Sequence, residues 1–254
     1  MNINNTEIFV EKLQGQGNLN FVLIHNAGGN HQFFTHQIEM LKKYGNVIQI
    51  DLPGHGTSAT INNYDMNTLS DFVIQICKNL SLKNIGLIGL NNGANIVIDI
   101  AAKNALPIDC SILIDPPIFM DASFIGEINA FIEALDNSET NSFITKLADD
   151  LFIDTDINNK EIAKNAFLNA HKKSLQNIFR GLIKWDADSA DILKKIKCRT
   201  LCILTDEHHC SYKKLREQAP HFEIGKVIGS KCWATLEVPE QVNAMIERFL
   251  KLSN

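Results

Sequence analysis

The chain has 254 residues, of which 45% are hydrophobic and 21% are charged, and its formal net charge is −5. This composition is that of an acidic globular protein without a basic stripe, so nucleic acid is excluded as an expected partner. The first residues lack the basic start and apolar core of a signal peptide, and no apolar run reaches membrane-spanning length, so we expect a cytoplasmic protein with no membrane partner.

The first elements are two strands and a helix. Residues 7–13 are predicted to form a strand, and the continuous apolar run Phe21–Ile24 is typical of a strand buried on both faces. It ends in His25-Asn26-Ala27-Gly28-Gly29, where backbone N–H groups can point at an anion. The apolar spacing from His31 to Lys43 predicts a helix. The glycines are equally consistent with a plain turn between strand and helix.

A third strand is predicted at Val47–Ile50. The segment Asp51-Leu52-Pro53-Gly54-His55-Gly56-Thr57-Ser58 follows, and its proline and glycines require a tight connection. A single histidine in a glycine-rich loop is more often structural than catalytic, so we interpret His55 as a turn residue.

The central stretch of the sequence is 84–93, Asn-Ile-Gly-Leu-Ile-Gly-Leu-Asn-Asn-Gly, followed by apolar residues 94–102. A short apolar run that ends on a glycine-flanked residue and continues into a helix indicates a strand, a sharp turn and a helix. Such a turn lifts residue 91 above the edge of the sheet, where a G-x-S-x-G elbow holds its nucleophile. Here the residue is Asn91, and a carboxamide is a very poor nucleophile.

The second half begins with a buried strand at Cys110–Ile114, which ends at Asp115-Pro116-Pro117 because paired prolines stop a strand. Residues 118–187 then alternate polar and apolar positions at helical spacing. Their aromatic residues are predicted to pack between helices or to line a pocket; they are Phe124, Phe131, Phe143, Phe152, Phe167 and Phe179.

Strands are predicted again at 200–204 and 222–228, and residues 239–252 form an amphipathic helix with a proline in its first turn. The six cysteines follow no disulfide-framework spacing, and we expect most of them to be reduced thiols in the core.

These motifs together resemble the α/β-hydrolase superfamily: a strand ending in His-x-x-Gly-Gly, then D-L-P-G-H-G-x-S, then strand, elbow and helix. The resemblance implies an α/β fold with a mostly parallel central sheet flanked by helices. It also implies a core domain of residues 1–117 and 188–254, with a helical cap of residues 118–187 inserted after the strand that ends at Asp115.

The same resemblance assigns the three positions of a catalytic triad. The elbow position is Asn91, the acid position after the strand 202–204 is His208, and the base position in the closing run 229–240 is Cys232. Every position has changed type, so ordinary Ser-His-Asp hydrolysis is excluded by this alignment. A shifted loop would present Asp206 or Glu207 as the acid, and Asp115 is another possible acid.

The oxyanion hole is better preserved in the alignment. The resemblance assigns it to the backbone N–H groups of Ala27 and Asn92. A pocket whose donors are directed at a carbonyl oxygen is therefore expected even without the usual nucleophile.

Three functions remain open from the sequence. Our working hypothesis is binding of a small carbonyl-containing molecule by a degenerate site, without Ser-type hydrolysis. The second is a hydrolase in which Cys232 and His208 act as a pair on an ester or thioester. The third is a lyase, isomerase or epimerase in which His208 or His209 is the base and the oxyanion hole holds an enolate.

A metal centre is not expected. The run His208-His209-Cys210 and Cys232 have suitable ligand types, but consecutive residues rarely point at one ion and no usual ligand spacing is present. We expect no cofactor, and the predicted partner is a small-molecule ligand or substrate.

Overall fold

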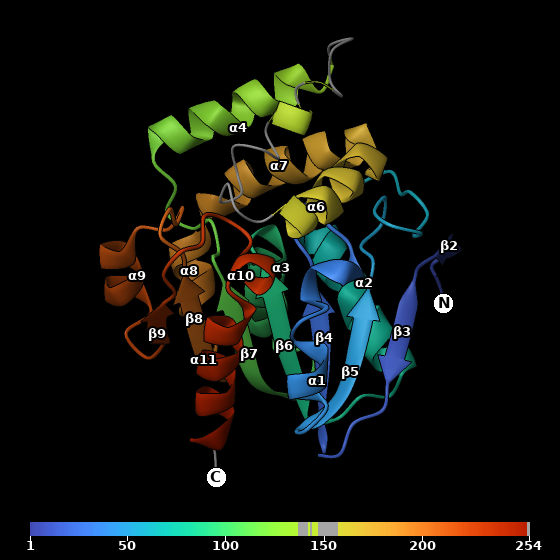
Figure 1. Cartoon of the computed structure of the whole chain (residues 1–254), viewed down its shortest axis with the longest axis vertical. Coiled ribbons are helices and arrows are strands. Elements are labelled where there is room, and N and C mark those ends of the chain that lie inside the picture. The colour runs from blue at the N-terminus through green and yellow to red at the C-terminus, as the bar shows by residue number, and fades with distance from the viewer. Residues whose placement is uncertain (137–141, 143, 147–156, 253–254) are drawn as a thin grey trace.

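A computed structural model of the chain describes residues 1–136, 142, 144–146 and 157–252. The described residues form a seven-stranded sheet (Figure 1), in which β3 pairs antiparallel with β5 and the other neighbours are parallel. In spatial order the strands are β3 (Val10–Leu13), β5 (Gly45–Ile50), β4 (Leu19–Ile24), β6 (Ile85–Leu90), β7 (Ile108–Ile114), β8 (Arg199–Leu204) and β9 (Glu223–Lys226). This is the mostly parallel sheet that the sequence predicts.

The N-terminal strand prediction was wrong in one respect. The segment 7–13 does not form one strand: β2 (Thr6–Glu7) pairs with β1 (Asn2–Ile3) in a separate hairpin, and β3 begins only at Val10. Asn4 and Asn5, both at positive φ, form the turn of this hairpin. Asparagine tolerates that conformation better than most residues.

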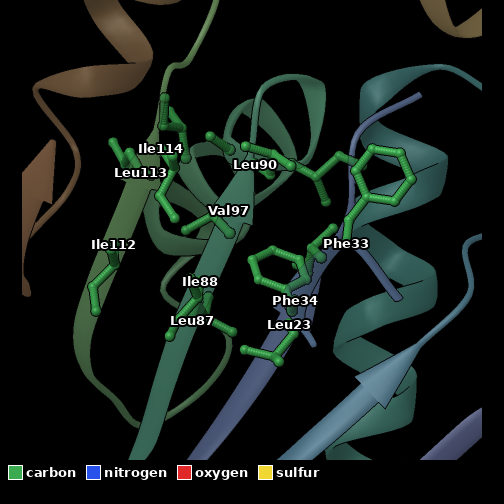
Figure 2. Close-up of a cluster of buried hydrophobic side chains, with 14 of the residues drawn as sticks. Leu23, Phe33, Phe34, Leu87, Ile88, Leu90, Val97, Ile112, Leu113 and Ile114 are labelled. Atoms are coloured by element: carbon green, nitrogen blue, oxygen red, sulfur yellow. The ribbon is translucent and has the colours of Figure 1, made fainter. Parts of the chain in front are cut away.

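The centre of the sheet is buried, and its strands are apolar on both faces. All six residues of β6 are buried, and Figure 2 shows leucine and isoleucine side chains of β4, β6 and β7 packed with Val97 and two phenylalanines. Gly89 permits a close approach between β6 and the helix that follows, since a Cβ there would lie 2.4 Å from the carbonyl oxygen of Gly93. This contact seats the helix after the elbow directly on the sheet.

Helices cover both faces of the sheet. The short α1 (Ile38–Leu41) and α11 (Pro239–Lys251) lie on one face, and α2 (Met66–Asn79) and α3 (Asn92–Lys103) lie on the other (Figure 1). Helix α2 was not predicted from the sequence, although Asp65 directly before it is a residue type that favours a helix start. The Asp65 side chain accepts a hydrogen bond from the Thr68 amide at 2.7 Å, as an N-cap residue does.

Shorter elements complete the frame. The predicted helix 31–43 is instead a 3₁₀ turn, η1 (His31–Phe34), followed by α1, and Phe33 and Phe34 of η1 are buried in the core. The remaining short helices are α8 (Ser189–Leu193), α9 (Tyr212–Gln218) and α10 (Ala234–Glu237).

All six cysteines are free thiols, as expected, and five of them are buried. Within the described ranges, no helix combines the length and apolar character that crossing a membrane requires.

Three longer helices lie over the carboxyl ends of the parallel strands (Figure 1): α4 (Ala122–Ala134), α6 (Ile157–Asn169) and α7 (Lys172–Asp186). The end of α7 is tied to the segment that leaves β7, because the Asp186 carboxylate accepts hydrogen bonds from the amides of Phe119 and Met120 at 2.7 and 2.9 Å. It is also tied to α3, since the indole of Trp185 donates to Asp99 at 3.3 Å. Phe143 and Phe152, named above as aromatic residues of this region, lie outside the described residues.

Candidate functional site

Asn91 occupies a sharp turn between β6 and α3, as the sequence predicts. Its backbone has φ 49° and ψ −119°, a strained combination for a residue with a side chain. Its carboxamide folds back onto the chain: Oδ1 accepts a hydrogen bond from the backbone amide of Asn92 at 3.0 Å, and Nδ2 donates to the carbonyl oxygen of Asp115 at 3.5 Å. One of the two expected oxyanion-hole donors is therefore occupied by the protein's own side chain.

The other expected donor is the amide of Ala27, which donates to no described residue. Its loop is shaped by a hydrogen bond from the Gly29 amide to the Asn26 carbonyl at 3.0 Å. Gly28 has φ 82°, where glycine carries no steric penalty. The loop presents one free N–H group beside the elbow.

Two buried imidazoles fix this loop against the segment 51–58. Nε2 of His55 accepts from the Gly28 amide at 3.0 Å, and Nε2 of His25 accepts from the Leu52 amide at 2.9 Å. Because these nitrogens accept, each ring is neutral and its Nδ1 donates to a carbonyl oxygen. Burial lowers the pKa of His25 to about 4 and that of His55 to about 3. His55 is the structural residue that the sequence analysis expects.

The structure corrects the predicted pairing of Cys232. Nε2 of His209, not a nitrogen of His208, lies 3.8 Å from the Cys232 Sγ. The ring of His208 turns the other way, and its Nδ1 lies 3.1 Å from the carbonyl oxygen of Thr205. Neighbouring residues on a loop point in different directions, so only one of the two histidines faces the site.

Burial keeps both members of the observed pair neutral. Cys232 is 5% exposed, and burial together with nearby carboxylates raises the pKa of its thiol well above the usual range. Burial also lowers the pKa of His209 to about 4, while its ring stacks on Phe124 with centroids 3.9 Å apart. A thiolate–imidazolium pair needs both shifts in the opposite direction.

The possible acids lie in different places. Asp115 is fully buried, and burial raises its pKa to about 7, against the opposing effect of the neighbouring Thr205. Asp206 is exposed; it accepts from the Gly229 amide at 2.7 Å and pairs with Lys226 at 3.3 Å. Asp206 therefore holds the loop between β8 and β9 to the loop after β9 and does not reach the cavity wall.

These elements enclose one cavity of about 150 Å³. Its polar end brings together the predicted residues Ala27, Asn91, Asn92 and Cys232, whereas His208, Asp115 and Asp206 are not among the residues that line it. The remaining lining residues come from the loops and from the helices above, and they are Asn26, Phe124, Glu127, Ile128, Phe131, Phe167, Phe179, His209 and Trp233.

The sequence analysis missed Glu127 and Trp233 as lining residues. Trp233 follows Cys232 directly in the closing motif, so its place near the site could have been predicted from that motif. Glu127 is an exposed helix position, and no sequence motif around it indicates a binding site. Among the described residues, no three histidine, cysteine or acidic side chains are grouped so that they could hold a metal ion.

Comparison with known proteins gives several similarities. A curated pimeloyl-[acyl-carrier protein] methyl ester esterase of Wigglesworthia glossinidia brevipalpis is 27% identical over 214 residues, which cover 77% of each chain. The (E)-2-((N-methylformamido)methylene)succinate hydrolase of Acinetobacter baylyi is 33% identical over 82 residues, covering 32% of this chain and 31% of that protein. Among solved structures, a thermophilic esterase from Thermogutta terrifontis has a TM-score of 0.83 at 21% identity, over 98% of this chain and 94% of that one.

A bromoperoxidase from Bacillus anthracis has a TM-score of 0.86 at 19% identity, over 97% of this chain and 96% of that one. At this identity the structural likeness shows the fold. The family model described as alpha/beta hydrolase fold matches residues 20–181, which include the oxyanion loop, the elbow and the helices above them. The chain therefore belongs to the α/β-hydrolase fold family.

Proposed function

We propose that this protein binds a small carbonyl-containing molecule in the cavity and does not hydrolyse it by a serine-type mechanism. The observation that carries the proposal is the hydrogen bond between Oδ1 of Asn91 and the amide of Asn92. An amide side chain at the elbow cannot attack a carbonyl carbon, and it occupies a donor that would stabilise an oxyanion. Binding through the free Ala27 amide remains available.

In this proposal Asn91, His208 and Cys232 stand at the nucleophile, acid and base positions of a degenerate triad. His208 is engaged with the Thr205 carbonyl, and Cys232 is a neutral thiol. Neither group can take up the original role of its position. Residues 118–187, with α4, α6 and α7, act as the cap over a core of residues 1–117 and 188–254.

The second candidate is a hydrolase that acts on an ester or thioester through Cys232 and His209. Two observations favour it: the relative with 27% identity is an esterase, and Sγ lies 3.8 Å from Nε2. The neutral state of both groups disfavours it, since attack requires the thiolate. His209 as the base of a proton-transfer enzyme is disfavoured for the same reason, because a pKa of about 4 makes it a weak base.

The experiment uses the intrinsic fluorescence of Trp233 in a Trp185→Phe background, since the chain has two tryptophans and only Trp233 lines the cavity described. We expect saturable quenching by the neutral ketone 4,4-dimethylpentan-2-one. We also expect hydrolysis of 4-nitrophenyl acetate to equal that of a Cys232→Ala variant. Absence of saturable binding, or turnover that Cys232→Ala abolishes, contradicts the proposal.

A further inference from the structure

The side chains around the cavity are dominated by aromatic rings. Phe131 and Phe179 form an edge-to-face pair with centroids 5.0 Å apart, and Phe167 packs against Trp233 at 5.7 Å. Phe124 closes a further part of the wall by stacking on His209. Aromatic rings carry negative potential on their faces, so a wall of this kind binds apolar groups and also attracts cations.

Among the described residues that line the cavity, Glu127 is the one that carries a full charge. Glu127 is an exposed carboxylate on α4, and no described residue forms an ion pair with it. The described lining residues include no lysine or arginine. His209 is a neutral ring at this position, so it does not offset the carboxylate.

Negative charge is also disfavoured at Cys232, another residue that lines the cavity. Burial is the main effect that disfavours a negative charge on the Cys232 sulfur; Asp115, Glu237 and Glu207 add to it, and Lys231 opposes it with a smaller effect. A negative charge is therefore disfavoured next to Glu127 and at the Cys232 sulfur.

We infer that the ligand is a small organic cation, a carbonyl compound that carries a quaternary or protonated amine, held by the aromatic wall and by Glu127. This inference rests on the proposed function, because it specifies the class of molecule that occupies the same cavity. A cavity of about 150 Å³ is of the size that holds a benzene molecule, so a trimethylammonium group fits within it.

The test compares two ketones of the same shape by titration calorimetry on the full chain. They are (2-oxopropyl)trimethylammonium and 4,4-dimethylpentan-2-one, which differ only in a charged nitrogen in place of a carbon. We expect the Kd of the cation to be about tenfold lower than that of the neutral ketone at low ionic strength. A cation–π contact together with a nearby carboxylate supplies a difference of this size. Added salt should reduce the ratio, because Glu127 is exposed.

Variants identify the groups responsible. Glu127→Gln should lower the affinity for the cation severalfold and should change that for the neutral ketone much less. Glu133→Gln is the matched control, since Glu133 is also an exposed position of α4 but does not line the cavity. Phe179→Leu keeps an apolar side chain without the ring, and it should weaken binding of the cation more than binding of the neutral ketone.

Each outcome decides a claim. Equal or tighter binding of the neutral ketone overturns the cation inference and leaves the proposed function standing. Preference for the cation that persists unchanged in both Glu127→Gln and Phe179→Leu shows that another site binds it, which also overturns the inference. If neither ketone binds, both the inference and the proposed function are wrong.

Discussion

The sulfur of Cys232 lies 3.8 Å from Nε2 of His209, in surroundings that keep the thiol protonated and the imidazole neutral. We therefore expect alkylation of Cys232 by iodoacetamide to be slow at neutral pH and to rise only above about pH 9, the range in which an unactivated thiol begins to ionise. His209→Ala should change the rate less than about twofold. Peptide mass mapping distinguishes Cys232 from the more exposed Cys198. Fast alkylation below neutral pH that depends on His209 would show an activated pair.

The ring of Phe124 shields His209, since the two rings are stacked with an interplanar angle of 3°. Phe124→Ala should let water reach the imidazole, and the His209 pKa should rise from about 4 toward 6.5, because burial is the main cause of its shift. Titration of the His209 ring proton by NMR measures this. Phe131→Ala on the same helix is the control, because Phe131 pairs with Phe179 instead. An unchanged His209 pKa in Phe124→Ala would disprove the shielding.

The buried imidazoles of His25 and His55 make the fold sensitive to acid. Their folded pKa values, about 4 and about 3, lie below the usual 6.5, so the unfolded chain binds more protons as the pH falls. Stability is therefore fully present above pH 6.5 and is lost between pH 6.5 and about 4, by roughly 3 kcal/mol for His25 alone.

Urea unfolding as a function of pH measures this loss. His25→Gln should be less stable than wild type at neutral pH, because the Leu52 amide loses a well-placed acceptor. It should also show a smaller loss between pH 6.5 and 4, since one titrating group is gone. The same slope in both proteins would contradict the assignment of this acid sensitivity to His25.

Replacing two glycines by alanine should change the stability of the protein in opposite directions. Gly28 has φ 82°, and a Cβ there would lie 2.4 Å from the Phe167 ring, so Gly28→Ala should cost about 1–3 kcal/mol. Gly126 lies inside α4 with nothing within 4 Å of a Cβ, so Gly126→Ala should stabilise by about 1 kcal/mol. Thermal unfolding compares them. Destabilisation by Gly126→Ala would contradict the exposed helical setting.

The sequence predicted the elements whose signals are local. The run before Asn91 is apolar throughout and flanked by glycines, and the structure places a buried strand, a sharp turn and a helix there. Ala27 and Asn92 were assigned as donors by the resemblance to the α/β-hydrolase superfamily, and both residues line the cavity.

The rest of the site depends on contacts that no local pattern contains. His208 and His209 are adjacent and chemically alike, and only the course of their loop decides which ring faces Cys232. The occupation of the Asn92 amide by the Asn91 side chain is a rotamer choice within the folded turn. Glu127 reaches the cavity through the packing of α4 over the sheet.

The most direct test of binding without hydrolysis is whether the site forms an acyl-enzyme. The protein is incubated with 4-nitrophenyl acetate, quenched in acid and digested, and the peptides that contain Asn91 and Cys232 are weighed. We predict that both peptides keep their unmodified mass and that no burst of 4-nitrophenol precedes the background reaction. An acetyl group on Cys232, together with turnover that Cys232→Ala abolishes, would show that the protein is a cysteine hydrolase and that the binding proposal is wrong.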